Sequence, residues 1–304
     1  MSGSGSGSSD LAQLRAGGKL ALARALAAAE TGGAAALLDA ALAAPVGVAL
    51  GLTGPPGVGK STLVAALIPR LRAQGQTVGV IAVDPSSRRS GGALLGDRTR
   101  IRHDPEDEGV FIRSMAARDR LGGVAEVTYP ALVLMRALFD VVIVETVGVG
   151  QSETEIAELA DYVLFCAEPG AGDALQFMKA GVVETPDLVL VTKADAGAAA
   201  QRTAADLRGA LSLAVQHPVP VGVVSARDGT GLEAVDTLLA TAAQDTHRLL
   251  DRRKAQTSAW LRSQFRANFG RIGLAQCESL LPEPGDAPFI AYRRLLSRIQ
   301  FSHD

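Results

Sequence analysis

Residues 54–61 read Gly-Pro-Pro-Gly-Val-Gly-Lys-Ser, and this stretch decides the fold. It matches G-x-x-x-x-G-K-[ST], the phosphate-binding P-loop that joins a strand to a helix. An apolar run at 46–52 predicts the strand, and a helical pattern at 60–72 predicts the helix. The motif therefore stands in the context that confirms it, and a glycine turn that binds nothing is the disfavoured alternative.

The loop residues have separate chemical tasks. Glycines let the backbone pass close to a phosphate, and the N–H groups at the helix start point at the anion. Lys60 can reach the β- and γ-phosphates, and the Ser61 hydroxyl can ligate Mg²⁺. The residues that we expect to hold the phosphates and Mg²⁺ here are Gly54, Gly57, Val58, Gly59, Lys60, Ser61 and Thr62.

The composition fits a globular chain with a large core. The 304 residues are 47% hydrophobic, and this length allows about two domains or one α/β domain with appendages. A net charge of −2 argues against nucleic acid as the main partner. Two distant cysteines predict a reducing, cytoplasmic location, and no uninterrupted apolar stretch is long enough to span a membrane.

Composition divides the chain into four segments. Residues 1–9 are a Gly/Ser repeat without the features of a signal peptide, and we expect a disordered leader. Residues 10–44, rich in Ala and Leu, predict a helical cap on the nucleotide domain, with an independent binding module as the alternative. Residues 45–245 form the P-loop domain, and residues 246–304 form a C-terminal helical arm.

Further apolar runs alternate with helical segments along the P-loop domain. This alternation predicts an α/β fold with a mainly parallel central sheet flanked by helices. The runs that we expect to form strands lie at 77–83, 110–113, 140–144, 162–167, 188–191 and 219–224.

Carboxylates follow two of these strands, at the edge where parallel strands meet the phosphate site. Asp84 is placed to hold Mg²⁺ or its water, and Asp97, in the long loop that follows, is a second candidate. Glu145 and Gly148 match the acidic-x-x-Gly element that senses a γ-phosphate, so Glu145 would bind Mg²⁺ or prepare the nucleophile.

The residue that would orient the attacking water is displaced from its usual place. Val149 directly follows Gly148, and Gln151 lies nearby, so we expect slow intrinsic hydrolysis. The candidates for catalysis are Lys60, Asp97, Glu145 and Gln151.

Two later loops predict guanine recognition. Thr192-Lys193-Ala194-Asp195 is close to the Asn-Lys-x-Asp base reader, in which the Asp accepts hydrogen bonds that adenine cannot offer. The aliphatic part of Lys193 would lie over the base. Thr192 stands where the motif has Asn, and this weakens one of the contacts that hold the base. Ser225-Ala226-Arg227 resembles the last guanine loop, whose backbone reads O6.

Together these motifs resemble the MeaB/ArgK family of P-loop GTPases from about Lys19 to Asp245. Departures from the family pattern are Arg88-Arg89, Ile101 and Thr192. The most specific marks are AVDPSS at 82–87, GGALLGDRTR at 91–100, LGGVA at 121–125, ETVGVGQSE at 145–153 and PGAGDALQFMKAG at 169–181.

The resemblance implies a chaperone that uses GTP and Mg²⁺ to assist an adenosylcobalamin-dependent acyl-CoA mutase. It places Asp84 and Asp97 in switch I and Glu145 in switch II. Asp173 and Lys179 fall in a third switch that faces the mutase. The chain lacks D-x-H-x-x-G, so cobalamin would sit on the partner.

The C-terminal arm is enriched in aromatic residues, which suggests an interface. The resemblance implies a homodimer formed by this arm, and the alternative is that the rings pack against their own domain. For the whole chain we keep three alternatives: a metal-insertion GTPase, a kinase that uses ATP, and a GTP-sensing scaffold without hydrolysis.

Overall fold

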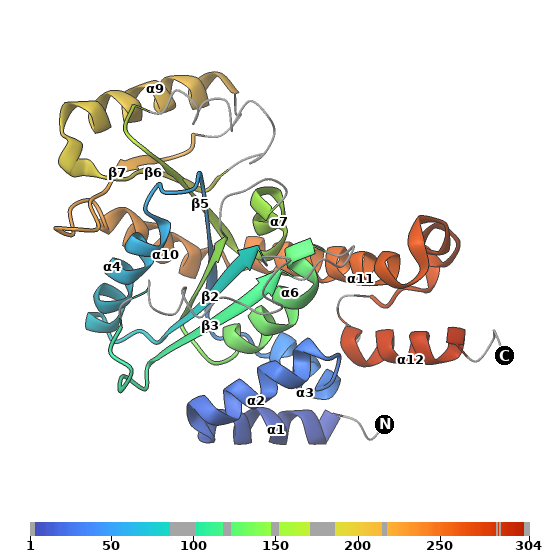
Figure 1. Cartoon of the computed structure of the whole chain (residues 1–304). Helices are drawn as coiled ribbons and strands as arrows, with labels where there is room; N and C mark the ends of the chain where they lie inside the picture. Colours follow the sequence, from blue (N-terminus) through green and yellow to red (C-terminus); the bar gives the residue numbers. More distant parts are fainter. Residues whose placement is uncertain are drawn as a thin grey trace.

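The computed structural model describes residues 4–85, 101, 103–117, 123–146, 152–170, 186–214, 218–283, 285 and 287–300. Its centre is a parallel seven-stranded sheet in the order β3-β2-β4-β1-β5-β6-β7 (Figure 1). The strands are β1 (Val48–Thr53), β2 (Val78–Pro85), β3 (Val110–Ala117), β4 (Val141–Thr146), β5 (Tyr162–Ala167), β6 (Leu188–Val191) and β7 (Val221–Val223). This confirms the predicted parallel α/β sheet.

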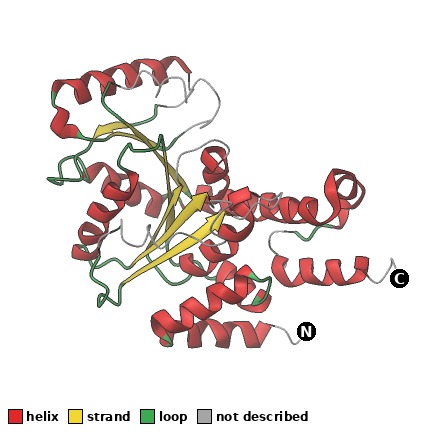
Figure 2. Cartoon of the chain, in the orientation of Figure 1, coloured by secondary structure: helices red, strands yellow, loops and turns green. Residues whose placement is uncertain are grey.

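Helices cover both faces of the sheet (Figure 2). Central strands are therefore almost continuously apolar, as a sheet buried on both faces requires. In β1, Leu50 and Leu52 join the core beneath α4 and α10, whereas Ala49 joins the core on the opposite face. The helices of this domain are α4 (Lys60–Ala73), α6 (Gly123–Arg136), α7 (Ser152–Leu159), η1 (Ala194–Ala196), α9 (Ala198–Ala214) and α10 (Glu233–Gln244).

Three helices form the N-terminal cap: α1 (Ser4–Ala16), α2 (Gly18–Glu30) and α3 (Ala35–Ala43). They lie below the sheet, where α2 and α3 pack against α6 and α1 packs against α2 and α3 (Figure 1). Arg113 of β3 pairs with Glu30 of the cap at 2.6 Å. The cap is therefore docked on the nucleotide domain. Its first helix begins at Ser4, within the segment for which the composition predicts disorder, and Leu11 and Leu14 of this helix are buried.

The C-terminal arm consists of α11 (Thr246–Cys277), η2 (Glu278–Leu280) and α12 (Pro288–Gln300). The helix α11 is broken at Gly270, and α12 returns beside the cap (Figure 1). Trp260 and Phe289 lie 4.7 Å apart between ring centroids, and Trp260 lies 5.7 Å from Tyr129 of α6. These rings are buried within their own chain, so their enrichment in the arm is explained without a dimer.

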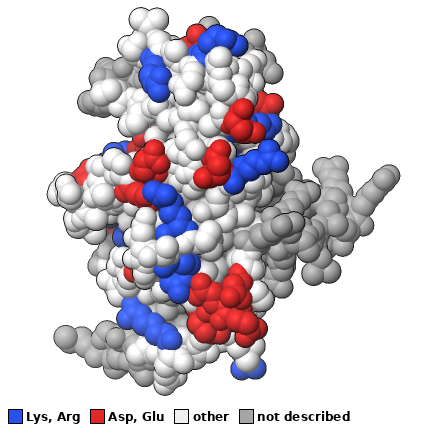
Figure 3. All heavy atoms as spheres, turned by 90° about the vertical axis from the view of Figure 1, so that its left-hand side faces the viewer, with Lys and Arg blue, Asp and Glu red and all other residues white. Residues whose placement is uncertain are grey.

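Charged side chains of both signs are interspersed on the face that carries α4 and α10 (Figure 3). Two ion pairs lie there: Arg70 contacts Asp236 at 2.5 Å, and Arg72 contacts Asp107 at 2.8 Å. Among the described helices, none is by itself long and apolar enough to cross a membrane. Only α2 and α3 taken together meet this test of length and composition, and the pair is bent by 112°.

Candidate nucleotide-binding site

The P-loop leaves the central strand β1 and enters α4 through backbone conformations that glycine adopts readily and other residues do not. Gly54 has φ +137°, and a Cβ at this position would lie 2.3 Å from the Cys166 carbonyl oxygen at the end of β5. Gly59, with φ +105°, sets the start of α4. Both angles disfavour L side chains, so glycine is required for the loop to wrap an anion at the helix N-terminus.

Lys60 lies across this loop. Its Nζ donates to the Gly54 carbonyl at 2.6 Å and to the Pro55 carbonyl at 3.0 Å, and the side chain is buried. The ammonium group is thereby held over the loop. When phosphate binds, its charged oxygens would take the place of these carbonyl oxygens as acceptors.

Ser61 and Glu145 are in direct contact. The Ser61 hydroxyl donates to Glu145 Oε1 at 2.5 Å, and Glu145 is only 9% exposed. Glu145 reaches this place because β4 pairs with β1 in parallel, with Leu52 opposite Glu145, so both strands end at the phosphate site. A hydroxyl and a carboxylate are hard oxygen donors, and this pair fits Mg²⁺.

A cavity of about 450 Å³ opens at this point. Three apolar residues of its wall, Ala82, Val83 and Ile101, are not among the predicted site residues, because an apolar side chain gives no chemical sign of nucleotide binding. The lining residues are Pro56, Gly57, Gly59, Lys60, Ser61, Thr62, Ala82, Val83, Ile101 and Glu145.

The predicted base-recognition loops meet beside the P-loop. The Thr192 hydroxyl, 5% exposed, donates to the Val58 carbonyl at 2.6 Å and lies 3.1 Å from the Ala167 carbonyl oxygen. We expect Thr192 to hold the base less firmly than Asn would. In the structure, its hydroxyl instead makes a buried hydrogen bond to the phosphate loop. The N–H of Ala194 donates to the Val224 carbonyl at 3.0 Å, which joins the two base loops.

The remaining residues of these loops differ in exposure: Lys193, Asp195 and Arg227 are exposed, whereas Ser225 is buried. Lys193 adopts a left-handed conformation, with φ +53°, and its Nζ lies 3.5 Å from Glu168, a partner that sequence reasoning misses. Asp195 is exposed in η1, where a base could reach it. Ser225 is buried, and Ala226 and Arg227 follow it in a turn.

Several predicted residues are outside the described part of the chain: Asp97, Gly148, Gln151, Asp173 and Lys179. Asp84 lies near the end of β2, opposite Ala116 of β3, but the structure describes only its backbone. In the described ranges, no group of three or more His, Cys, Asp and Glu side chains is suited to hold a metal ion.

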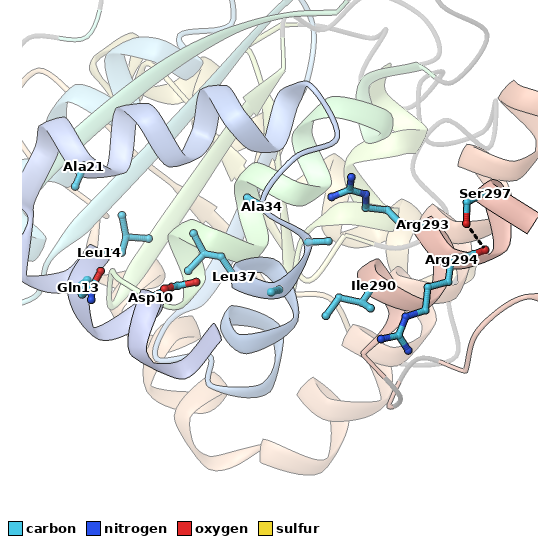
Figure 4. Close-up of a pocket in the computed structure, with 12 residues that line it drawn as sticks. Asp10, Gln13, Leu14, Ala21, Ala34, Leu37, Ile290, Arg293, Arg294 and Ser297 are labelled. Atoms are coloured by element: carbon cyan, nitrogen blue, oxygen red, sulfur yellow. Dashed lines mark hydrogen bonds between the residues drawn. The ribbon is translucent and has the colours of Figure 1, made fainter. Parts of the chain in front are cut away.

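A larger cavity, about 940 Å³, has no P-loop residue in its lining. Figure 4 shows the residues that line it. It is lined by residues of the cap and of α12. Leu14, Leu37 and Ile290 supply apolar surface, and Arg293 and Arg294 supply positive charge. The smaller cavity is the candidate nucleotide site, because it alone of these two contains the P-loop and Glu145.

Comparison with known proteins matches this arrangement to one family. The family described as "Methylmalonyl Co-A mutase-associated GTPase MeaB" matches residues 20–272. The crystal structure titled "LAO/AO transport system kinase" superposes with a TM-score of 0.68 at 28% identity, covering 96% of this chain and 97% of that one.

Two relatives show the same resemblance in sequence. The mitochondrial "Methylmalonic aciduria type A homolog" of Mus musculus is 38% identical over 74% of this chain and 56% of its own length. "GTPase ArgK" of Escherichia coli is 46% identical over 48% of this chain and 44% of its own length. The matched region thus spans about half the length of these relatives. Because the family model covers most of the chain, the protein belongs to the MeaB family of methylmalonyl Co-A mutase-associated GTPases.

Proposed function

We propose that this protein hydrolyses GTP to GDP and phosphate with Mg²⁺. We propose further that it acts as a switch that assists cofactor loading, protection or reactivation of an adenosylcobalamin-dependent acyl-CoA mutase. Methylmalonyl-CoA mutase or a close relative is the client, because the family's name associates its members with that enzyme. We propose a cytoplasmic location and a homodimer; the homodimer rests on the family resemblance, since the buried rings of the arm pack within their own chain.

The observation that carries the proposal is the contact between Ser61 and Glu145 beneath a complete P-loop. Ser61 directly follows the lysine that we expect to bind phosphate. Glu145 is the first residue of the segment that the resemblance places in switch II. Thr192 joins the base-recognition loop to the same P-loop through its hydrogen bond to Val58, which supports the proposal that one nucleotide reaches both loops.

Each residue then has a role in hydrolysis. Lys60 would bind the β- and γ-phosphates, and Ser61 and Glu145 would hold Mg²⁺ directly or through water. Mg²⁺, when bound, neutralises charge that develops across the β- and γ-oxygens. Asp195 would accept hydrogen bonds from guanine N1 and N2, which sets the preference for GTP over ATP.

The partner completes the cycle in this proposal. Because Val149 occupies the place after Gly148 and Gln151 is displaced, the water is poorly oriented in the free protein. We expect the mutase to raise turnover through the third switch, where Asp173 and Lys179 face the partner.

The test is GTP turnover, with ATP as control, with and without a purified adenosylcobalamin-dependent acyl-CoA mutase. We expect turnover that is selective for GTP and rises with the mutase. Lys60→Ala should abolish turnover, since the phosphates lose their cation, whereas Lys254→Ala, at an exposed lysine of α11, should not change it. Asp195→Asn should reduce the preference for GTP.

The outcomes separate the parts of the proposal. Equal use of ATP would contradict guanine recognition by Asp195. Turnover that is selective for GTP but indifferent to every mutase tried would contradict the client. Unchanged turnover in Lys60→Ala would contradict the nucleotide site itself.

A further inference from the structure

The larger cavity, about 940 Å³, is a groove between helices of the cap and the last helix of the arm (Figure 4). The residues that α12 contributes to it follow the helical spacing i, i+3, i+4 and i+7: Ile290, Arg293, Arg294 and Ser297. Residues with this spacing lie on one face of a helix. One face of α12 therefore lines the groove over nearly two turns, or about 10 Å.

The rest of the groove comes from the cap, and much of it is built from small side chains. The helix α1 contributes residues that again follow helical spacing: Asp10, Gln13 and Leu14. The start of α3 contributes the alanines at 34–36 and then Leu37. Small side chains allow the backbone of another helix to approach closely. Two helix faces and a run of alanines thus form a surface against which one further helix can pack.

The positive charge of the groove is concentrated on α12. Arg293 and Arg294 are both exposed, and neither makes an ion pair with another residue that the structure describes. The whole arm, residues 246–304, carries ten Lys and Arg against five Asp and Glu, although the net charge of the chain is −2. A partner surface that meets α12 should therefore be acidic. Asp10, exposed in α1, disfavours carboxylates beside it and so confines them to the α12 side.

We propose that this groove docks an acidic amphipathic helix of a partner protein. Apolar side chains on one face of that helix would pack against Leu14, Leu37 and Ile290. Carboxylates along its flank would pair with Arg293 and Arg294, as in other complexes in which a groove holds an amphipathic helix. The docking requires neither GTP nor the P-loop, so it goes beyond the proposed function.

The probe is a synthetic peptide of about 15 residues, a length at which an isolated helix is marginal and helix formed on binding can be seen. It carries leucines at i, i+3, i+4 and i+7 with glutamates beside them, and the control peptide has lysine for every glutamate. Fluorescence anisotropy measures binding to the full chain, and circular dichroism measures helix content. We expect the acidic peptide to bind and gain helix, and the basic peptide to bind at least about tenfold more weakly.

Three variants test charge and shape separately. Arg293→Glu with Arg294→Glu should weaken binding of the acidic peptide at least about tenfold, because like charges then face each other. Arg266→Glu with Arg271→Glu is the matched control: it makes the same change of charge at exposed positions of α11 outside the groove, and binding should stay close to wild type. Ala36→Leu should also weaken binding, since its larger side chain occupies the groove. Thermal unfolding checks that each variant remains folded.

Three results would overturn the proposal. The first is that the acidic peptide does not bind at about 1 mM. The second is an equal loss of binding in the arginine variant and its control, which would reduce the effect to general attraction by a basic arm. The third is a chain that self-associates in sedimentation and dissociates on Ala36→Leu, which would assign the groove to a second copy. Absence of GTP hydrolysis would leave peptide binding unchanged, so the two proposals fail separately.

Discussion

Gly54 holds the turn from β1 into the phosphate loop at a backbone angle that an L side chain resists. Its φ of +137° directs the missing Cβ at the Cys166 carbonyl oxygen, only 2.3 Å away. The neighbour is the backbone of a buried strand, which cannot move aside like a flexible side chain. The first glycine of the motif is therefore required by the sheet as well as by the nucleotide.

We predict that Gly54→Ala loses GTP binding and lowers the free energy of unfolding by about 1–3 kcal/mol, the usual range for backbone strain. Nucleotide titration and thermal unfolding measure the two effects. Gly75→Ala is the matched control: its φ is +79°, and its added Cβ meets no atom within 4 Å. Wild-type GTP affinity in Gly54→Ala would show that the loop relaxes around the methyl group.

At the scale of elements, the last helix is fastened to the first ones. Both carboxylate oxygens of Asp39 in α3 accept backbone N–H groups at the start of α12, from Phe289 and Ile290, each at 2.9 Å. This carboxylate satisfies donors that a helix start leaves open and lies at the positive end of the helix dipole. The cap and the arm are thereby one packed unit.

Asp39→Ala should loosen α12 at its start. We expect a loss of about 0.5–2 kcal/mol, as for removal of a helix N-cap, with faster hydrogen exchange confined to the arm and the cap. Asp10→Ala, at an exposed aspartate of α1, is the control and should change neither quantity. Unaltered exchange in α12 after Asp39→Ala would mean that ring packing alone holds the helix.

Local sequence patterns predict the helices and strands of this fold well. They predict less well the contacts between elements that are distant in the sequence. Strands such as β5 and β6 follow from their apolar runs, because a covered parallel sheet admits little else. The pairing of Ser61 with Glu145 could also be predicted, since parallel strands end at a common edge. Asp39 and Phe289 are 250 positions apart, and no spacing rule joins them, so the docking of α12 required the structure.

At the scale of the whole molecule, Asp161 joins the sheet to the helices beneath it. It is buried ahead of β5, where Arg136 of α6 contacts it at 3.0 Å and Arg253 of α11 at 2.7 Å. The N–H of Ala49 in β1 donates to it at 2.9 Å. Burial favours the neutral acid, but the charges of Arg136 and Arg253 outweigh it and hold the pKa of Asp161 below its usual range.

This lowered pKa makes stability depend on pH in one direction. Aspartate in an unfolded chain has a pKa of about 3.9. The contribution of Asp161 to stability is therefore present above that pH and is lost as the pH falls toward the lower pKa of the folded state. Asp161→Asn should cost about 3–5 kcal/mol at pH 7, because two guanidinium groups lose their buried partner. Denaturant unfolding at pH 7 and at a series of pH values below about 3.9 measures both effects.

Asp236→Asn is the control for Asp161→Asn. Asp236 pairs with Arg70 in a partly exposed setting, with side chains 26% and 33% exposed, so its loss should cost about 1 kcal/mol or less. Equal losses in the two variants would contradict a special role for the buried network.

The position of β1 at the centre of the sheet has a consequence for biosynthesis. Both strands that flank β1 come much later in the chain: Leu50 pairs with Ile143 on one side and with Tyr162 on the other. During translation this apolar strand leaves the ribosome long before either partner exists, and contacts so distant in sequence form slowly. We therefore expect the nascent chain to expose β1 and to depend on holding chaperones until β5 has emerged.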